Sequence, residues 1–386
     1  MEKNRNLALV GKVNLDIYGA SGQVTSLGDT KDFADGGIGV SLGGASANVA
    51  RSINTLSRVY GDEGSTKIVT RIGEPPEQQG YNNFGEHLLA QHAAEMTFRL
   101  LQHEGVNYTD VAAGKEGPGI AKSVVSNFRG GRHIFKQMPL QAQFAAANDG
   151  MVSSVHPVMT AELSGASYVF VDPARPALAK VATDVCEENR VPSIVDHGLK
   201  SWPKDELKAS LLGDVLKNAD IIIVPADAFV PGMRDGEKNP DKLFETLSGK
   251  EYKARTIIMS DGTDPVRLSH HGKVSEIPVT PAENPINVSG AGDTRDGALM
   301  FFLSRGDEME TAVAKATEMA TIRIQYPGND WEHHIYDHVK DNPLFADDMD
   351  ELDAMHDKTQ PGLFDDLPNA ANDRDDDLDH DAATHG

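Results

Sequence analysis

The segment YVFVDPARPALAKVATDVCEENRVPSIVD, residues 168–196, places two compact apolar runs on either side of a stretch with helical character. The runs are Tyr168–Asp172 and Pro192–Asp196, and Ala177–Asn189 lies between them. The alternation continues with strand-like runs at Asp220–Val224 and Thr256–Ser260 and helix-like segments at Lys204–Lys217 and Pro240–Leu247. Short strands that alternate with helices are typical of βαβ units. The sequence therefore predicts an α/β fold with a mostly parallel central sheet and helices on both faces.

The N-terminal region predicts two more strands. An apolar run at Leu7–Val10 ends at a glycine, and every second residue from Val13 to Ile17 is then apolar. The residues between them include Asn14 and Asp16. Period-2 alternation is the pattern of a half-buried strand, so the amide and the carboxylate should lie side by side on one surface.

Three further elements are predicted from apolar spacing and glycine placement. One helix begins at about Ser46, and a second covers Phe84–His103 with Gly105 placed to cap its C-terminus. Residues Ala121–Gln137 predict a hairpin that turns at Gly130-Gly131, because paired glycines adopt positive φ without strain.

The charge distribution divides the chain into a body and a tail. Its 386 residues carry a formal net charge of −23, and the segment Ala346–Gly386 holds 14 acidic and 2 basic residues. We predict a folded domain over residues 1–345 and a disordered acidic tail over residues 346–386, with an acidic interaction arm as the alternative for the tail. An acidic chain is not expected to bind nucleic acid, because phosphate contacts need clustered Lys and Arg.

The expected location is the cytoplasm, with no membrane partner. No apolar run approaches the roughly 20 residues that span a bilayer. The N-terminus lacks the apolar core of a signal peptide. A single cysteine, Cys186, leaves no internal disulfide to form.

The most informative segment for chemistry is NVSGAGD, Asn287–Asp293, which leads into a helix-like stretch at Thr294–Leu303. Small residues let the backbone approach a ligand closely, and the start of a helix presents N–H groups and a positive dipole end. The combination predicts an anion hole suited to a phosphate. Asp293 lies at its edge, where an ionised carboxylate can orient a substrate hydroxyl and accept its proton.

A second glycine pair opens a helix near the other end of the chain, in Gly43-Gly44-Ala45-Ser46-Ala47-Asn48. Together with Asn14 and Asp16, Asn48 offers the donors and acceptors that bind a neutral polyol. The alternative is a glycine-rich turn in which Asn48 serves only as a local cap.

With these two motifs the chain resembles the ribokinase-like (PfkB) family of carbohydrate kinases over roughly residues 7–330. The family's GGxxxN element corresponds to Gly43, Gly44 and Asn48, and its GAGD element to Gly290–Asp293. The resemblance implies a three-layer fold, in which helices flank a mostly parallel central sheet. It also implies a small β-sheet lid built from parts of about residues 12–40 and 118–138.

The resemblance also implies an ATP-dependent kinase that phosphorylates a hydroxyl of a sugar, a nucleoside or a related small molecule, with Mg²⁺ as a second cofactor. Asp293 would be the catalytic base, and Gly290, Ala291 and Gly292 would form the anion hole. The sugar would be held by Asn14, Asp16, Gly43, Gly44 and Asn48. Ser260 and Gly262 would line the ATP site. A homodimer formed through the lid is a further expectation from the family.

Several positions depart from the family pattern. Asn287-Val288-Ser289 replaces the usual DTx triplet, which puts activation by a monovalent cation in doubt. Pro225–Phe229 stands where the family's NxxE element should help to organise Mg²⁺, so the metal ligands stay unassigned. A catalytically impaired sugar- or nucleotide-binding protein of the same fold is therefore the alternative. A dinucleotide enzyme is disfavoured, because the first strand is not followed by GxGxxG.

Overall fold

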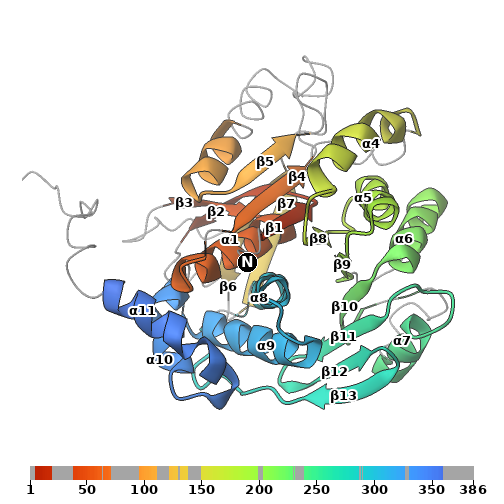
Figure 1. Cartoon of the computed structure of the whole chain (residues 1–386). Helices are drawn as coiled ribbons and strands as arrows, with labels where there is room; N and C mark the ends of the chain where they lie inside the picture. Colours follow the sequence, from red (N-terminus) through yellow and green to blue (C-terminus); the bar gives the residue numbers. More distant parts are fainter. Residues whose placement is uncertain are drawn as a thin grey trace, which may run out of the picture.

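A nine-stranded sheet forms the centre of the protein, in the order β13-β12-β11-β10-β9-β8-β1-β4-β5 (Figure 1). The computed structural model describes residues 5–19, 38–62, 64–70, 95–110, 121–128, 131–137, 149–198, 203–228, 230, 239–286, 288, 290–326 and 330–359. The strands are β1 (Asn6–Val10), β4 (Ser65–Thr70), β5 (Asn107–Asp110), β8 (Tyr168–Val171), β9 (Ser193–Asp196), β10 (Ile221–Pro225), β11 (Thr256–Asp261), β12 (Asp264–His270) and β13 (Lys273–Ile277). All neighbours from β11 to β5 pair in parallel, whereas β12 and β13 are antiparallel additions at one edge. The predicted mostly parallel sheet is confirmed.

Helices cover both faces of this sheet (Figure 1). One face is covered by α1 (Ala45–Val59), α8 (Ala291–Arg305) and α9 (Met309–Gln325), and the other by α4 (Asp149–Leu163), α5 (Pro176–Asn189), α6 (Glu206–Asn218) and α7 (Pro240–Leu247). The alternation within β1 explains the two layers: Leu7 and Leu9 pack into the core on the α1 side, and Ala8 and Val10 into the core on the α5 side. Residues 95–103 are also helical and end at Gly105, whose φ is +68°.

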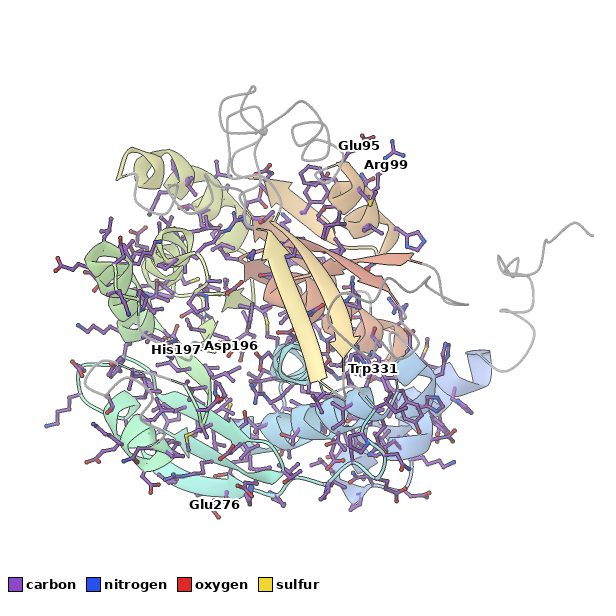
Figure 2. All side chains as sticks on the ribbon, turned by 180° about the vertical axis from the view of Figure 1, so that it is seen from behind. Glu95, Arg99, Asp196, His197, Glu276 and Trp331 are labelled. Carbon is purple, nitrogen blue, oxygen red and sulfur yellow. The ribbon has the colours of Figure 1, made fainter. Side chains whose placement is uncertain are left out.

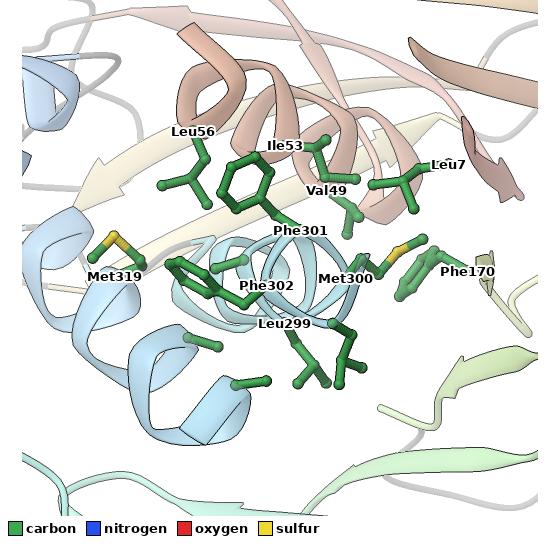
Figure 3. Close-up of a cluster of buried hydrophobic side chains, with 14 of the residues drawn as sticks. Leu7, Val49, Ile53, Leu56, Phe170, Leu299, Met300, Phe301, Phe302 and Met319 are labelled. Carbon is green, nitrogen blue, oxygen red and sulfur yellow. The ribbon is translucent and has the colours of Figure 1, made fainter. Parts of the chain in front are cut away.

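The helix α8 is buried on all sides after its first turn and lies between α1 and α9 (Figure 3). Apolar side chains from α1 face Phe301, and Phe302 and Met319 pack together on the α9 side (Figure 3). A helix surrounded by core must pair any polar side chain that it carries, since an unpaired buried charge is costly. This requirement decides how Arg295 and Asp296, in the first two turns of α8, are arranged.

A second, four-stranded sheet stands apart from the first, in the order β3-β2-β6-β7. Its strands are β2 (Asn14–Gly19), β3 (Ile38–Gly43), β6 (Ala121–Phe128) and β7 (Gly131–Gln137). The pair β6–β7 is the hairpin that the sequence predicts over Ala121–Gln137. The strand β3 ends at Gly43, directly before α1, so this small sheet adjoins the start of that helix.

The C-terminal region corrects the predicted boundary of the tail. The chain continues after α9 through η2 (Asp330–His334), α10 (Ile335–Val339), η3 (Pro343–Asp348) and α11 (Met349–Thr359). Phe345 is fully buried and Leu352 is 1% exposed, so η3 and α11 pack onto the domain although their sequence is acidic. Helical structure therefore extends to Thr359, and residues 360–386 lie outside the described residues. In the part that the structure describes, no helix is both long and apolar enough to cross a membrane.

Candidate active site

The residues predicted to form an anion hole lie at the first turn of α8. Gly290 is the N-cap, with a φ of +82°, and its carbonyl oxygen accepts the N–H of Thr294 at 2.8 Å. A Cβ atom added at Gly290 or Gly292 would meet no described atom within 4 Å, so open space adjoins the helix start. Because the N–H groups of a first turn have no partner within their own helix, an anion in this space would face backbone donors. Asn287 and Ser289 lie outside the described residues.

The start of α1 depends on Gly44. Its φ is +91°, and an added Cβ would lie 2.4 Å from the carbonyl oxygen of Lys12. Only glycine fits this conformation and this contact, so the first turn of α1 lies directly against the chain between β1 and β2. Asn48 follows on the same turn, and its N–H donates to the carbonyl of Gly44 at 3.1 Å.

The two glycine-led helix starts meet through their side chains. The Asn48 Nδ2 atom donates to Asp293 Oδ2 at 2.6 Å. The amide that is predicted to bind a polyol is therefore in contact with the predicted base. One turn further along α1, Ser52 Oγ donates to the carbonyl oxygen of Thr294 at 3.0 Å. Gly297 permits this approach, because a Cβ there would lie 2.6 Å from the Val49 carbonyl oxygen.

Asn14, one of the residues predicted to hold the acceptor, lies at the start of β2 and pairs with Gly43 of β3. Asn14 is 6% exposed, and its Oδ1 atom has no hydrogen-bond partner among the described residues. A buried acceptor without a partner is costly unless a ligand supplies the donor. Asp16 is described only by its backbone, which pairs with Ser41; its side chain lies outside the described residues.

A buried carboxyl, that of Asp172, lies near the start of α1. Asp172 follows β8 and accepts the N–H of Ala174 at 2.8 Å and, at 3.4 Å, that of Lys12. Burial raises the pKa of this carboxyl, although the hydrogen bonds and the charge of Lys12 oppose the shift. A Cβ atom on Gly11 would lie 2.4 Å from Ser46 Oγ and 2.5 Å from Asp172 Cβ, so the chain between β1 and α1 needs a glycine at that position.

Arg295, in the first turn of α8, is buried and paired. It is 8% exposed, and its Nη1 donates to Ser260 Oγ at 2.6 Å. Its Nε and Nη2 donate to Asp296 Oδ1 at 3.1 and 2.9 Å. Because α8 is buried, the guanidinium has little contact with water and pairs with these two side chains instead. The bond to Ser260 connects the first turn of α8 to the end of β11.

Asp196, at the end of β9, completes this buried network. It lies beside His197 near the middle of the molecule (Figure 2), close enough to Asp296 for the two carboxyl groups to interact. Burial raises the pKa of Asp196 well above its usual value, and the charge of Asp296 raises it further. Burial also raises the pKa of Asp296, although Arg295 opposes the shift. Burial and the neighbouring carboxyl therefore both favour the protonated form of Asp196.

The predicted nucleotide residues lie at the end of β11. Ser260 is half-buried and is in register with Pro225 of β10, whose following residue Ala226 donates its N–H to the Ser260 carbonyl at 2.8 Å. Gly262 has a φ of +58°, and an added Cβ would meet no described atom within 4 Å. Ser260 is linked through Arg295 to the helix that carries Asp293, whereas no described hydrogen bond links Gly262 to the other site residues.

No metal centre can be assigned from the described residues. They include no group of three or more His, Cys, Asp or Glu side chains that could hold a metal ion. Of the carboxylates near the anion hole, Asp296 is engaged by Arg295 and Asp293 by Asn48.

Sequence reasoning missed the partners behind Asn48. Arg51 Nη1 donates to Asn48 Oδ1 at 3.1 Å, and Arg51 forms an ion pair with Glu104 at 2.8 Å. The i, i+3 spacing of Asn48 and Arg51 on a predicted helix was the available signal. Glu104 gave none, because only the fold brings the end of helix 95–103 next to α1.

Known proteins resemble this chain in sequence. The family model described as "pfkB family carbohydrate kinase" matches residues 4–331. An adenosine kinase from Saccharomyces cerevisiae is 26% identical over 151 residues, which are 37% of this chain and 43% of that protein. Adenosine kinase 1 from Arabidopsis thaliana is 29% identical over 96 residues, 24% of this chain and 28% of that protein. These matches span less than half the length of the curated relatives.

Solved structures extend the likeness to the whole fold. Arabidopsis thaliana ribokinase, complexed with ribose and ATP, superposes with a TM-score of 0.56 at 17% identity, covering 87% of this chain and 99% of that one. A Burkholderia thailandensis nucleoside kinase in complex with inosine gives a TM-score of 0.54 at 16% identity, covering 84% and 92%. The expected ribokinase-like fold is confirmed, and the family match spans most of the sequence. The chain belongs to the pfkB family of carbohydrate kinases.

Proposed function

We propose that this kinase transfers the γ-phosphate of ATP to a hydroxyl group of a sugar or a nucleoside, with Asp293 as the base. The observation that carries the proposal is the 2.6 Å contact between Asn48 Nδ2 and Asp293 Oδ2. This contact joins the start of α1, which is suited to binding a polyol, to the start of α8, which is suited to binding a phosphate. A base must lie within hydrogen-bonding reach of the hydroxyl that it deprotonates, and this contact supports such a position.

The acceptor would be held by Asn14, Asp16, Gly43, Gly44 and Asn48. The buried Oδ1 atom of Asn14 supports this assignment, because a hydroxyl of the acceptor would supply the donor that the described residues lack. The small sheet would act as a lid over the acceptor, and a closed lid would exclude water and limit wasteful hydrolysis of ATP. A homodimer through that sheet stays a prediction.

In the transfer step, Asp293 orients the acceptor hydroxyl and accepts its proton. The acceptor oxygen forms a bond to the γ-phosphorus as the bond from that phosphorus to the bridging oxygen of ADP breaks, and ADP takes the bonding electrons. The backbone N–H groups at Gly290, Ala291 and Gly292 would stabilise the negative charge on the transferring group. The open space beside Gly290 and Gly292 fits this role.

ATP supplies the phosphoryl group in this scheme. Ser260 and Gly262 would line its site, which agrees with the positive φ and open surroundings of Gly262. We include Mg²⁺ as the counter-ion of the nucleotide and assign it no protein ligand. Activation by a monovalent cation stays in doubt, because Asn287-Val288-Ser289 departs from the family's triplet.

The test is a coupled assay of ADP release with Mg-ATP over a panel of sugars and nucleosides, with and without potassium. We expect release that depends on one class of acceptor, and a phosphate ester of that acceptor in the product. A protein that is stabilised by an acceptor in a thermal-shift assay but releases no ADP would instead support the binding-only alternative. The observation behind this alternative is that Pro225–Phe229 stands where the family has its NxxE element.

A further inference from the structure

Both ends of the Asn48 side-chain amide are in use. Its Nδ2 donates to Asp293 Oδ2 at 2.6 Å, and its Oδ1 accepts from Arg51 Nη1 at 3.1 Å. A guanidinium only donates and an ionised carboxylate only accepts, so both neighbours require the same orientation of the amide. A rotated amide would turn its oxygen toward the carboxylate of Asp293. Arg51 therefore excludes the orientation that would repel the base.

Arg51 is itself held in place by a two-point contact. Its Nε donates to Glu104 Oε2 at 3.2 Å and its Nη2 to Glu104 Oε1 at 2.8 Å. Nη2 also donates to the carbonyl oxygen of Leu42 at 3.3 Å. The side chains of Arg51 and Glu104 are 21% and 19% exposed, so water screens the pair only in part. A paired fork of this kind fixes direction as well as distance.

The contacts of Glu104 and Arg51 join three parts of the fold. Glu104 follows helix 95–103, and its carbonyl oxygen accepts Asn54 Nδ2 of α1 at 3.2 Å. Leu42 belongs to β3 of the small sheet, so Arg51 joins that sheet to α1. The path from Glu104 through Arg51 and Asn48 to Asp293 consists of direct hydrogen bonds. A purely structural ion pair would need no contact with Asn48.

We propose that Arg51 and Glu104 are positioning residues for the transfer reaction. They hold the Asn48 amide so that its N–H group points at Asp293 Oδ2, and this contact fixes the orientation of the base. Neither residue is placed in contact with the acceptor or the nucleotide, and both act through Asn48. This inference rests on the proposed function of Asp293 as the base.

The decisive experiment measures kcat and KM for Arg51→Met, Arg51→Lys and Glu104→Gln. We expect Arg51→Met to lower kcat by about 10- to 100-fold, because a displacement of about 1 Å at a reacting group has effects of this size. The KM for ATP should not change. Arg51→Lys should recover part of the loss, since an ammonium can donate to Asn48 but cannot form the fork with Glu104. Glu104→Gln should show a smaller loss than Arg51→Met.

The matched control is Arg58→Met. Arg58 lies two turns further along α1 and forms the same fork, with Nε donating to Glu332 Oε1 at 2.9 Å and Nη2 to Oε2 at 2.6 Å. It has no contact with Asn48, so its loss should leave kcat unchanged. Thermal unfolding of each variant shows whether it is folded at the assay temperature. Equal losses of kcat in Arg51→Met and Arg58→Met would overturn the proposal.

A double-mutant cycle separates positioning from a general structural role. In an Asn48→Ala background, Arg51→Met should cause no further loss of kcat, because its effect passes through the missing amide. If the fold-losses of kcat in Asn48→Ala and Arg51→Met simply multiplied in the double variant, Arg51 would not act through Asn48.

Crystal structures of the wild type and Arg51→Met test the positioning without any turnover. The contact between Asn48 and Asp293 should be lost or its amide rotated in the variant, and an unchanged contact would refute the proposal. If the wild type phosphorylates no acceptor, the proposed function fails, while these structures still decide whether Arg51 orients the amide.

Discussion

Gly297→Ala tests the close contact of α1 and α8 on which the site depends. The added Cβ would lie 2.6 Å from the Val49 carbonyl oxygen and 2.7 Å from Ser52 Cβ. The first of these distances is about 0.8 Å short of the 3.4 Å at which ordinary contact begins, and a close-packed interior has no free volume to absorb it. The helices must therefore separate, and overpacking of this kind costs about 1–3 kcal/mol of stability.

The separation should also reach the site, because α1 carries Asn48 and α8 carries Asp293. Their contact is 2.6 Å, and an added 0.8 Å or so would exceed the roughly 3.2 Å limit of a good N–H···O bond. We expect kcat to fall by up to about 100-fold. Urea unfolding measures the stability, and acceptor-dependent ADP release measures the activity.

The control for this substitution is Gly213→Ala in α6, where an added Cβ meets no described atom within 4 Å. It should stabilise the protein by about 0.5–1 kcal/mol, because alanine favours the helix interior, and should leave kcat unchanged. If Gly297→Ala matched the wild type in both stability and kcat, the close packing of these helices would not support the site as described.

Three other changes test separate parts of the account. Asn14→Ala should leave the free energy of unfolding, measured with urea, within about 1 kcal/mol of the wild type. It should raise the KM for the acceptor, measured by steady-state kinetics, about tenfold. An unchanged KM would remove Asn14 from the acceptor site. The pKa of Asp196 is raised in the folded state, so the wild type loses stability as the pH rises from about 4 through that raised pKa. Over this pH range the free energy of unfolding of Asp196→Asn, measured with urea, should increase relative to that of the wild type. A difference that does not depend on pH would contradict the raised pKa of Asp196. Lys315 is 3% exposed, and its ammonium nitrogen lies 2.7 Å from the carboxylate of buried Asp348. Lys315→Met should therefore lower the free energy of unfolding by about 3–5 kcal/mol. A loss below about 1 kcal/mol would show that this pair does not hold η3 to α9.

The sheet could be predicted because its strands carry local signals. The apolar runs at Tyr168–Asp172 and Asp220–Val224 correspond to β8 and β10 within one residue at each end. Parallel strands buried on both faces are continuously apolar, and the intervening helices are bounded by polar residues, so no long-range information is needed. The hairpin over Ala121–Gln137 was found for a similar reason, from its paired glycines.

The C-terminal helices could not be predicted in the same way. Asp and Glu make up four of the eleven residues of α11, and a solvated helix face can have the same composition as a disordered tail. The burial of Leu352 and the ion pair between Arg305 and Glu351 depend on contacts with α8, which the local sequence does not reveal.

In the site, the glycines and Asp293 were found from motif and spacing, whereas the buried network was not. Arg295 in a first turn reads as a solvent-facing side chain unless the burial of α8 is known. Its partner Ser260 and the carboxyl of Asp196 come from distant strands, and only the parallel sheet brings their ends together.

The proposed transfer depends on Asp293 as the base that faces a bound acceptor. The most direct measurement compares the wild type with Asp293→Asn, using calorimetric binding of the acceptor and single-turnover transfer of labelled phosphate from Mg-ATP. The amide keeps the shape of the carboxylate and can still accept from Asn48, so binding should be preserved while the transfer rate falls by about 10²- to 10⁴-fold. A variant that binds the acceptor normally and transfers phosphate at nearly the wild-type rate would contradict the account.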